Sequence, residues 1–385
     1  MNLRGYRRPD GRVGFRNHVL ILPTTVCSSS VAQKISQAVP GSISVPNSSG
    51  CGLLGKDQEV YARTLVNTAG NPNVAATLVV GLGCEPVSAE IASAKIEKFG
   101  KPVAHLSIQQ VGGTTNTLQE GIKLAQQMVA EAYNLKLEPV SVADLVIGLE
   151  CGGSDAASGL TANPAVGAAV DRLVDEGGTA IIGETDECIG VELLMAANAK
   201  TETVGKRIIE VVRRFEEHVR MYGAELSTGQ PTRGNMEAGL STIEEKSLGC
   251  VTKIGSRPIV EVLEYAEIPR QKGPIFMDTP GFDVTSITGM VAAGCQILVF
   301  TTGMGTPLGN AVAPVIRVIS NTPAYHRMKE NTDINGGTIL EGIEAIAGVG
   351  EKIYNMIMQV ANGQPTKAEI TGDNQFAIWR TTTEL

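Results

Sequence analysis

The chain has 385 residues, of which 43% are hydrophobic, 19% charged and 4% aromatic, and its formal net charge is -8. This composition excludes a fibrous or disordered protein, and the length suffices for a large buried core of mainly aliphatic side chains. The acidic charge excludes a nucleic-acid or anionic-membrane surface, which would need a basic field, so small solutes are the expected ligands.

Nothing in the sequence predicts a membrane segment. No stretch of 18 apolar residues occurs, and the N-terminus MNLRGYRRPDGRVG lacks the hydrophobic centre of a signal peptide, so we expect a soluble, cytoplasmic protein. Its seven cysteines should then be free thiols, which leaves catalysis, metal binding or burial as their roles.

One pattern recurs along the chain: a short apolar strand, a loop of small residues, then a helix with a period near 3.6 residues. It occurs at residues 18–39, 77–100, 145–178 and 296–311, and an amphipathic helix within 337–363 should end at Gly363. Strands such as LVV and LVI do not alternate, which is typical of parallel strands buried on both faces. The sequence therefore predicts an α/β fold of doubly wound, mostly parallel sheets built from Rossmann-like units.

Two polar segments divide this pattern. One is NLKLEPVSVAD at 134–144, and the other is the glycine-bearing stretch 225–257, which shows little periodicity. A loop of that length is either a linker or functional. We therefore expect three parts: a first α/β domain at 1–136, a second α/β segment at 137–226, and the long polar loop with a C-terminal α/β domain at 227–385.

Three cysteines share a setting within this pattern. Cys51 (NSSGCGLLG), Cys84 (GLGCEP) and Cys151 (LECGGSD) each have a glycine neighbour, which lets the backbone approach a bulky ligand closely. Cys84 and Cys151 follow predicted strands, where ligands bind in doubly wound sheets. No CxxC occurs, so metal ligands would come from separate strand ends. Three such thiolates could hold iron or an iron-sulfur cluster with one position open for substrate.

Packing is the competing interpretation of every cysteine, because free cysteine is among the most buried residue types. We assign Cys250 and Cys295 to packing, and we favour packing for Cys27 and Cys188, which lack flanking glycines. Spacing alone leaves both interpretations of the three glycine-flanked cysteines open.

Carboxylates form a second group of candidates, since a divalent cation or a general acid/base could use their oxygens. They are Glu85, Glu150 and Asp155 beside the cysteines, Glu184 and Asp186 in IIGETDECIG, and Asp278 and Asp283 in FMDTPGFD. Asp155 and Thr185 have a second interpretation as helix caps, because Asp and Thr after a strand often cap the next helix.

Cationic residues matter if the substrate is an acid. Arg12 and Arg16 in GRVGFRNH precede the first buried strand, and Lys246 and Lys253 lie in the long polar stretch. Arg binds a carboxylate through two parallel hydrogen bonds, and a desolvated Lys can act as a base. The ordinary role of such residues is solvated surface, which is the alternative for each.

Eight stretches together resemble the altronate and galactarate dehydratase family, to which the large subunit of sulfolactate sulfo-lyase also belongs. They are GYRRPDGRVGFRN, SSGCG, NPNVAATLVVGLGCE, ECGGSDAASGLTANPAVG, EEKSLG, MDTPGFDVTSITGMVAAGCQI, FTTGMGTPLG and NTDINGGTI. Family members dehydrate sugar acids to 2-keto-3-deoxy acids with the help of iron or another divalent metal, and the sulfo-lyase branch expels sulfite instead. The resemblance therefore implies a hydro-lyase whose cofactor is iron, as Fe2+ or an iron-sulfur cluster, or another divalent metal.

The resemblance also sharpens the three-cysteine site. GCG, GLGCE and ECGGSD are motifs of the dehydratase branch, whereas the sulfo-lyase branch is expected to keep only the third. On this basis Cys51, Cys84 and Cys151 would hold the metal that polarises the C3 hydroxyl of a 2,3-dihydroxy acid. The alternative is a mononuclear iron held by fewer thiols together with Glu85 or Asp155.

Four residues would then carry the rest of the reaction. Arg12 and Arg16 would bind the substrate carboxylate, and Lys246 or Asp155 would take the proton from C2.

Two features depart from the family pattern. Dehydratases often carry a histidine just before GCG, where this chain has VPNSSGCG with Asn47 or its neighbours, so details of metal or substrate binding should differ. Single-chain dehydratases also carry a small N-terminal SAF domain, whereas this chain begins directly at the large domain. The resemblance therefore implies a separate small SAF-domain subunit and an oligomer. The alternative functions are a sulfolactate-type C–S lyase subunit and a non-catalytic sugar-acid binding subunit.

Overall fold

The computed structural model describes residues 2–383 and 385, and its α/β architecture confirms the predicted fold class. Within these residues the strands form three sheets. The largest is parallel and runs in the order β10 (Glu261–Leu263), β11 (Pro274–Met277), β9 (Thr179–Ile182), β8 (Val146–Cys151), β12 (Ile297–Thr302), β13 (Val315–Ile319) and β14 (Ile334–Asn335). The second is parallel and runs β4 (Ser42–Ser44), β3 (His18–Pro23), β5 (Val74–Gly81) and β6 (Val103–Ser107). The third is antiparallel and runs β2 (Val13–Gly14), β1 (Leu3–Arg7) and β7 (Glu138–Val140).

Helices precede, connect and cover these strands. In the first part of the chain they are α1 (Val26–Ala38), α2 (Gly55–Gly70), α3 (Ala89–Ile96), α4 (Ile108–Val111) and α5 (Thr114–Tyr133). In the remainder they are α6 (Ala162–Asp175), α7 (Glu192–Ala197), α8 (Glu202–Met221), α9 (Leu226–Gly229), α10 (Arg233–Glu237), α11 (Ile243–Val251), α12 (Asp283–Ala293), α13 (Thr322–Arg327), α14 (Ile346–Ala361) and α15 (Lys367–Thr371). No helix within the described residues combines the length and apolar character that crossing a bilayer requires.

Alternate side chains of the central strands enter two different cores. Ile297 and Val299 of β12 pack in the cluster that includes α6 and α14, whereas Leu298 and Phe300 pack in the cluster shared with α2 and α12. Successive side chains of a strand point to opposite faces of the sheet, so both faces of β12 are covered and all its residues are buried. This burial on both faces explains why the strand sequences show no polar alternation.

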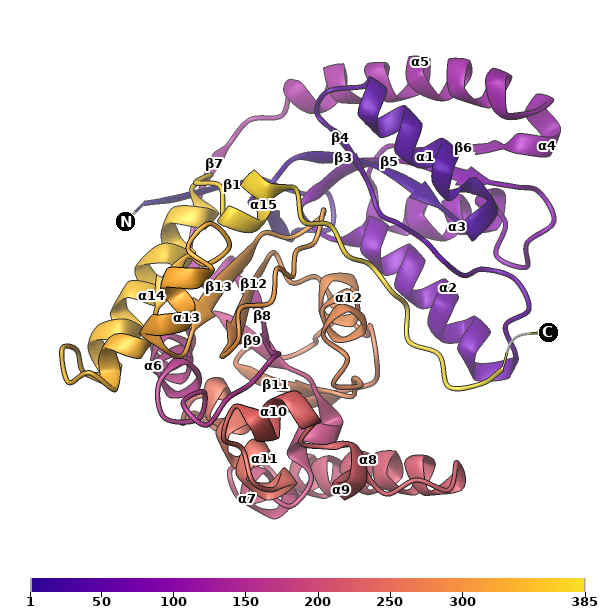
Figure 1. Cartoon of the computed structure of the whole chain (residues 1–385). Helices are drawn as coiled ribbons and strands as arrows, with labels where there is room; N and C mark the ends of the chain where they lie inside the picture. Colours follow the sequence, from indigo (N-terminus) through magenta and orange to yellow (C-terminus); the bar gives the residue numbers. More distant parts are fainter. Residues whose placement is uncertain (1, 384) are drawn as a thin grey trace.

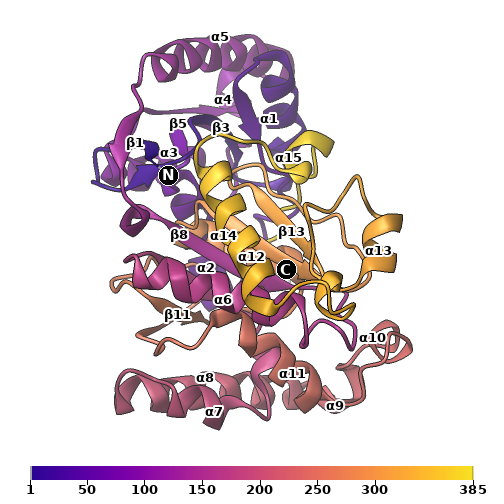
Figure 2. The same cartoon turned by 90° about the vertical axis from the view of Figure 1, so that its left-hand side faces the viewer.

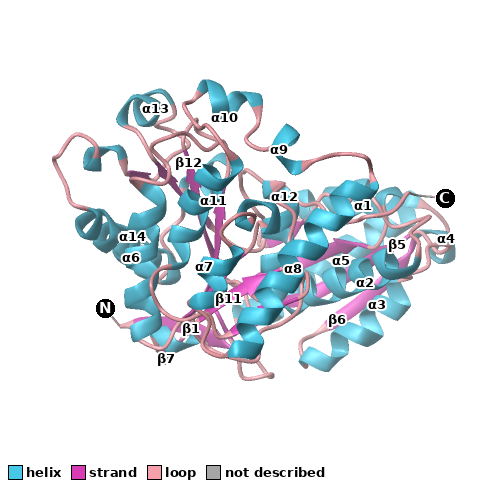
Figure 3. Cartoon of the chain, turned by 90° about the horizontal axis from the view of Figure 1, so that it is seen from below, coloured by secondary structure: helices cyan, strands magenta, loops and turns pink. Residues whose placement is uncertain are grey.

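The elements are stacked in layers (Figures 1 and 2). α1 and α5 pack on one face of the four-stranded sheet, and α2 and α3 pack on the other. α2 in turn contacts α12, which lies on the seven-stranded sheet, while α6 and α14 pack together on the opposite face of that sheet. Seen from below, helices flank the strands on both sides (Figure 3).

The expected second and third parts of the chain build one sheet together. β8 and β9, from 137–226, pair with β12 and β11, from 227–385. The polar stretch 225–257 contains α9, α10 and α11, so it is more helical than its weak periodicity predicts. The helix expected within 337–363 starts only at Ile346, and it stops just before Gly363, whose φ is 96°.

The C-terminal segment crosses from α15 to the start of α2 (Figure 1). The backbone N–H and hydroxyl groups of Thr381 and Thr382 donate four hydrogen bonds of 2.7–3.0 Å to the Asp57 carboxylate of α2. Trp379 packs edge-on against Tyr265 with ring centroids 5.6 Å apart. Burial raises the pKa of Asp57, but the hydrogen bonds together outweigh burial and hold this pKa below its ordinary value. This segment therefore ties the two large sheets together.

Replacing Asp57 by Ala should lower the free energy of unfolding by about 1–3 kcal/mol, because the hydrogen bonds that hold the C-terminal segment to this buried carboxylate are lost. Since the pKa of Asp57 is lowered in the folded state, its contribution to stability is complete above the pKa of an unfolded carboxyl, about 4, and is lost as the pH falls through the lower folded value. Urea unfolding at pH 7 and pH 3 measures both effects. Glu59→Ala, an exposed change on the same helix, is the control, and equal stability of the two variants at pH 7 would contradict this role.

Candidate active site and metal-binding group

Loops that leave neighbouring strands meet at one edge of the seven-stranded sheet. β8 ends at Cys151, the turn after β9 carries Glu184 and Glu187, and α12, which follows β11, begins at Asp283. These three strands are adjacent and parallel, so their carboxyl ends lie together. Ligands bind at such edges in open α/β sheets.

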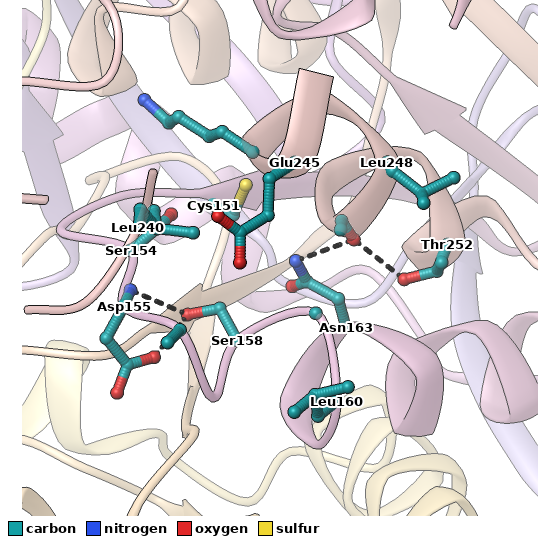
Figure 4. Close-up of a pocket in the computed structure, with 14 residues that line it drawn as sticks. Cys151, Ser154, Asp155, Ser158, Leu160, Asn163, Leu240, Glu245, Leu248 and Thr252 are labelled. Carbon is teal, nitrogen blue, oxygen red and sulfur yellow. Dashed lines mark hydrogen bonds between the residues drawn. The ribbon is translucent and has the colours of Figure 1, made fainter. Parts of the chain in front are cut away.

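A cavity of about 440 Å³ opens here between the loop after β8 and α11 (Figure 4). Cys151, Asp155 and Lys246 all line it. Leu160 and Leu248, both exposed, give the cavity an apolar side. The structure therefore brings together one predicted metal ligand and both predicted general bases.

Four buried side chains beside the cavity form a group that could hold a metal ion. The sulfur and carboxylate oxygen atoms of Cys151, Glu184, Glu187 and Cys250 all lie within 4.8 Å of one another. The Lys253 ammonium lies among them: Nζ is 3.1 Å from Cys151 Sγ and 2.9 Å from Cys250 Sγ, and it also pairs with the Glu184 carboxylate. Lys253 therefore occupies the position of a cation between two thiols and a carboxylate.

A second lysine links this group to the cavity. Lys246 Nζ donates to Glu187 Oε1 at 2.7 Å and to Gln230 Oε1 at 2.6 Å. Cys151 Sγ donates to the other Glu187 oxygen at 3.3 Å. Burial lowers the pKa of Lys246, but the charge and hydrogen bond of Glu187, with Cys151 and Asp186, together outweigh burial and raise this pKa above its ordinary value. Lys246 is therefore a cation at the cavity wall and is poorly suited to take a proton.

Carboxyl groups outnumber cations in this region. Burial is the main cause that raises the pKa of Glu184 to about 8, of Asp186 to about 6 and of Asp283 to about 7. Burial also raises the pKa of Glu150 well above its ordinary value, and the charge of Glu184 adds to this effect. With Glu187, five carboxyl groups share the region with two ammonium groups. Further positive charge would therefore be stabilised here.

Two carboxylate oxygens of this region are without a donor. Among the buried side-chain atoms that the structure describes, Glu150 Oε1 and Asp186 Oδ1 have no hydrogen-bond partner. Ser286 donates to the other oxygen of Glu150 at 2.6 Å. A buried polar atom without a hydrogen-bond partner is costly, so these two oxygens fit a region that also takes up a cation.

The donor set suits a divalent transition metal. Thiolates and carboxylates together are typical ligands of ions such as Fe2+ or Zn2+, whereas Mg2+ takes oxygen ligands. A hydrogen bond with Cys250 and burial raise the pKa of Cys151 well above its ordinary value, and burial raises the pKa of Cys250 to about 12. Binding of a metal would therefore displace the thiol protons and move the Lys253 ammonium aside.

Two glycines allow a carboxylate to pack directly against the backbone in this site. A Cβ on Gly152 would lie 2.2 Å from Asp283 Oδ2, and a Cβ on Gly303 would lie 2.5 Å from Asp155 Cγ. Any side chain at either position would have to push a carboxylate away. The glycine after Cys151 thus serves the close packing of the loop against Asp283.

Asp155 does not cap the following helix, because Thr161 is the N-cap residue of α6. Its carboxylate accepts hydrogen bonds from Ser158 Oγ and Ser320 Oγ, both at 2.7 Å, and from Asn321 Nδ2 at 2.9 Å. The helix-cap interpretation is therefore wrong. The three donors hold the carboxylate in a fixed orientation at the cavity wall.

Arg12 and Arg16 are engaged elsewhere. Arg12 Nη2 donates to Asp10 Oδ2 at 2.6 Å and to the carbonyl of Gly70 at 2.7 Å. Gly70 is the last residue of α2, which precedes β5. Arg16 pairs with both oxygens of Glu369 in α15, at 2.8 and 3.0 Å. Neither guanidinium is among the groups that line the cavity, so their position gives no support to a role in binding the substrate carboxylate.

Cys51 and Cys84 lie at the carboxyl edge of the four-stranded sheet, and both are exposed. Cys51 follows β4, with Sγ 3.8 Å from Thr25 Oγ1, and Cys84 follows β5. Neither belongs to the four-residue group that contains Cys151. In the described residues the three predicted ligands are therefore not assembled into one group, and the three-cysteine site stays a prediction.

Sequence reasoning missed two members of the observed group and undervalued a third residue. The sequence pattern favours packing for Cys250, does not single out Glu187, and presents Lys253 as one of several cations. A usable signal was helical spacing: Lys246, Cys250 and Lys253 are separated by four and three positions, so they share one face of α11 and the turn that follows it.

The chain resembles known proteins along almost its full length. Residues 5–133 match the second domain of D-galactarate dehydratase/altronate hydrolase, and residues 142–384 match the C-terminal domain of D-galactarate/altronate dehydratase.

Three relatives are similar over 97–98% of the chain. The (2R)-sulfolactate sulfo-lyase subunit beta of Chromohalobacter salexigens is 37% identical, and 96% of its length is covered. The altronate dehydratase of Bacillus subtilis is 33% identical with 77% of its length covered, and the galactarate dehydratase (L-threo-forming) of Escherichia coli is 34% identical with 76% covered. These matches show that the chain belongs to the D-galactarate/altronate dehydratase family.

Proposed function

We propose that the chain is a hydro-lyase that dehydrates a sugar acid of the altronate or galactarate type to a 2-keto-3-deoxy acid. The observation that carries this proposal is the cavity, where the Asp155 carboxylate and the Lys246 ammonium lie beside the Cys151 group of candidate metal ligands. The names of the altronate and galactarate dehydratases among the relatives support the substrate class.

The reaction removes the proton on C2 and the hydroxyl on C3, and the resulting enol rearranges to the keto acid. Lys246 stays protonated, so it would bind the substrate carboxylate and stabilise the negative charge that develops next to it. Asp155 would then take the C2 proton, because it is the carboxylate of the cavity wall whose orientation is fixed by three donors. The apolar side of the cavity at Leu160 and Leu248 would exclude water from the reacting carbons.

A divalent metal, when bound, would act as a Lewis acid on the C3 hydroxyl. Cys151, Glu184, Glu187 and Cys250 would hold it. Iron as Fe2+ is our first choice, because iron-sulfur clusters are held mainly by thiolates and this group offers two thiols among its four ligands. Metal-binding thiols must stay reduced, which agrees with a cytoplasmic location.

A second candidate is a C–S lyase that expels sulfite from a sulfolactate-type acid. The (2R)-sulfolactate sulfo-lyase subunit beta is 37% identical to this chain, and the similarity covers 98% of the chain. The name of that relative, a subunit beta, also supports a two-component enzyme. We therefore propose a separate small SAF-domain subunit as the partner for either reaction.

The purified chain, alone and with a co-expressed small subunit, should convert at least one hexonate or aldarate of a panel to a 2-keto acid when Fe2+ is supplied under anaerobic conditions. Sulfolactate belongs to the same panel, with sulfite as the product measured. Sulfite release alone would replace the dehydratase proposal by the C–S lyase, and binding of sugar acids without any turnover would indicate a non-catalytic binding subunit.

Glu187→Gln and Cys250→Ser should each lower the bound iron at least roughly tenfold, because each removes a ligand from the four-residue group. Metal analysis after anaerobic purification, with acid-labile sulfide measured in parallel, provides the readout. Cys27→Ser, a change at an exposed thiol, is the matched control. Loss of iron in Cys51→Ser and Cys84→Ser but not in Cys250→Ser would instead favour the three-cysteine site, and sulfide would favour a cluster.

Asp155→Asn should lower kcat by roughly 10²–10⁴-fold, which is the contribution of a positioned general base. Lys246→Met should lower kcat/KM mainly through weaker substrate binding, and Lys246→Arg should recover part of this loss because it keeps the charge. Steady-state kinetics on the substrate found in the panel separates the two roles. Unchanged kcat in Asp155→Asn would remove Asp155 as the base.

A further inference from the structure

Two cations far from the cavity are buried without a carboxylate partner. The Arg8 and Lys101 side chains belong to residues that are 4% and 6% exposed. Among the ion pairs within the described residues, neither cation is paired with an Asp or Glu. Arg and Lys are almost never fully buried unless they are paired, so the positive charge here lacks its usual compensation.

These cations converge on the carbonyl groups at the end of α2. Lys101 Nζ donates to the carbonyls of Ala69, Asn71 and Val74 at 2.7, 2.9 and 3.0 Å. Arg8 Nε donates at 2.7 Å to the carbonyl of Pro72, which lies between Asn71 and Val74 in the chain. The C-terminal end of a helix offers roughly half a negative charge, which offsets only part of two cations.

Neighbouring charges do not remove the imbalance. Arg12, which also donates to the end of α2, is neutralised by Asp10. Burial lowers the pKa of Arg8 to about 10. Burial lowers the pKa of Lys101 well below its ordinary value, and the positive charges of Arg12 and Arg8 lower it further.

A cavity of about 390 Å³ lies beside this pair of cations. Arg8 and Lys101 line it together with Arg7 and Glu138, and Ala75 and Pro102 place it near the amino ends of β5 and β6. The Arg7 side chain is 45% exposed, and its Nε is 3.7 Å from Glu138 Oε2. Three cations and one rim carboxylate thus surround a space large enough for a small solute.

We propose that this cavity binds a small oxyanion, either inorganic phosphate or the carboxylate of a small acid. The buried charges of Arg8 and Lys101 supply the field, and the half-exposed Arg7 supplies guanidinium N–H donors when it turns from Glu138 to the anion. The site is separate from the Cys151 cavity, and it does not depend on the proposed reaction.

Thermal unfolding of the full chain tests this site with potassium phosphate or potassium acetate against potassium chloride at equal ionic strength. An anion bound to the folded state should raise the midpoint in a saturable manner. Arg7→Gln should weaken the apparent affinity roughly tenfold, since it removes a charge-assisted hydrogen bond. Glu138→Gln should strengthen the affinity, because it removes the competing carboxylate.

Arg220→Gln, which removes one positive charge from the exposed side of α8, is the matched control and should leave the response unchanged. Leu135→Glu, which places a carboxylate in the cavity wall, should abolish the response. A response to phosphate alone would identify phosphate as the source of the oxyanion, and a response to acetate alone would identify a carboxylate. No saturable response, or equal responses of Arg7→Gln and Arg220→Gln, would overturn the proposal.

Discussion

The buried ammonium of Lys253 is the interaction on which the candidate site depends. It is paired with Glu184 and lies within 3.1 Å of the sulfur atoms of Cys151 and Cys250. A charge that loses one partner in the interior costs about 3–5 kcal/mol, so folding must bring its partners to one point. Those partners come from β8, from the turn after β9 and from α11. The position of α11 on the sheet edge is therefore fixed by electrostatics as well as by packing.

This constraint also places the cation of the cavity. Lys246 lies seven positions before Lys253, about two helical turns away on the same face of the α11 segment. While Lys253 is held among the thiols, Lys246 reaches Glu187 at 2.7 Å and lines the cavity. Glu187 in turn accepts a hydrogen bond from Cys151, so the cavity wall and the buried group belong to one hydrogen-bond network.

The sequence predicts what is local and leaves open what is not. Buried strands, their loops and the class of fold follow from apolar runs and periodicity, and Cys151 and Asp155 are candidates because they follow such a strand. Lys246 is a candidate only as a cation in the polar stretch 225–257. The sequence does not predict that Cys51 and Cys84 lie at the edge of a different sheet from Cys151, because every strand–loop–helix unit has the same local pattern. Nor could it pair Arg16 with Glu369, 353 positions away.

The excess of carboxyl groups over lysines indicates that the site takes up a further cation. If the two lysines served only to neutralise Glu184 and Glu187, then Glu150, Asp186 and Asp283 would remain buried or half-buried without a positive partner. Burying such groups lowers the free energy of unfolding, since replacing buried ions by apolar residues is often neutral or stabilising. Stability alone therefore does not explain them. The end of α2 shows the opposite imbalance, because Arg8 and Lys101 are buried cations without a carboxylate. An excess of acidic groups around the Cys151 group and an excess of cations beside the second cavity are explained most simply by two ligands of opposite charge, a cation at the edge of the seven-stranded sheet and an anion beside β5 and β6.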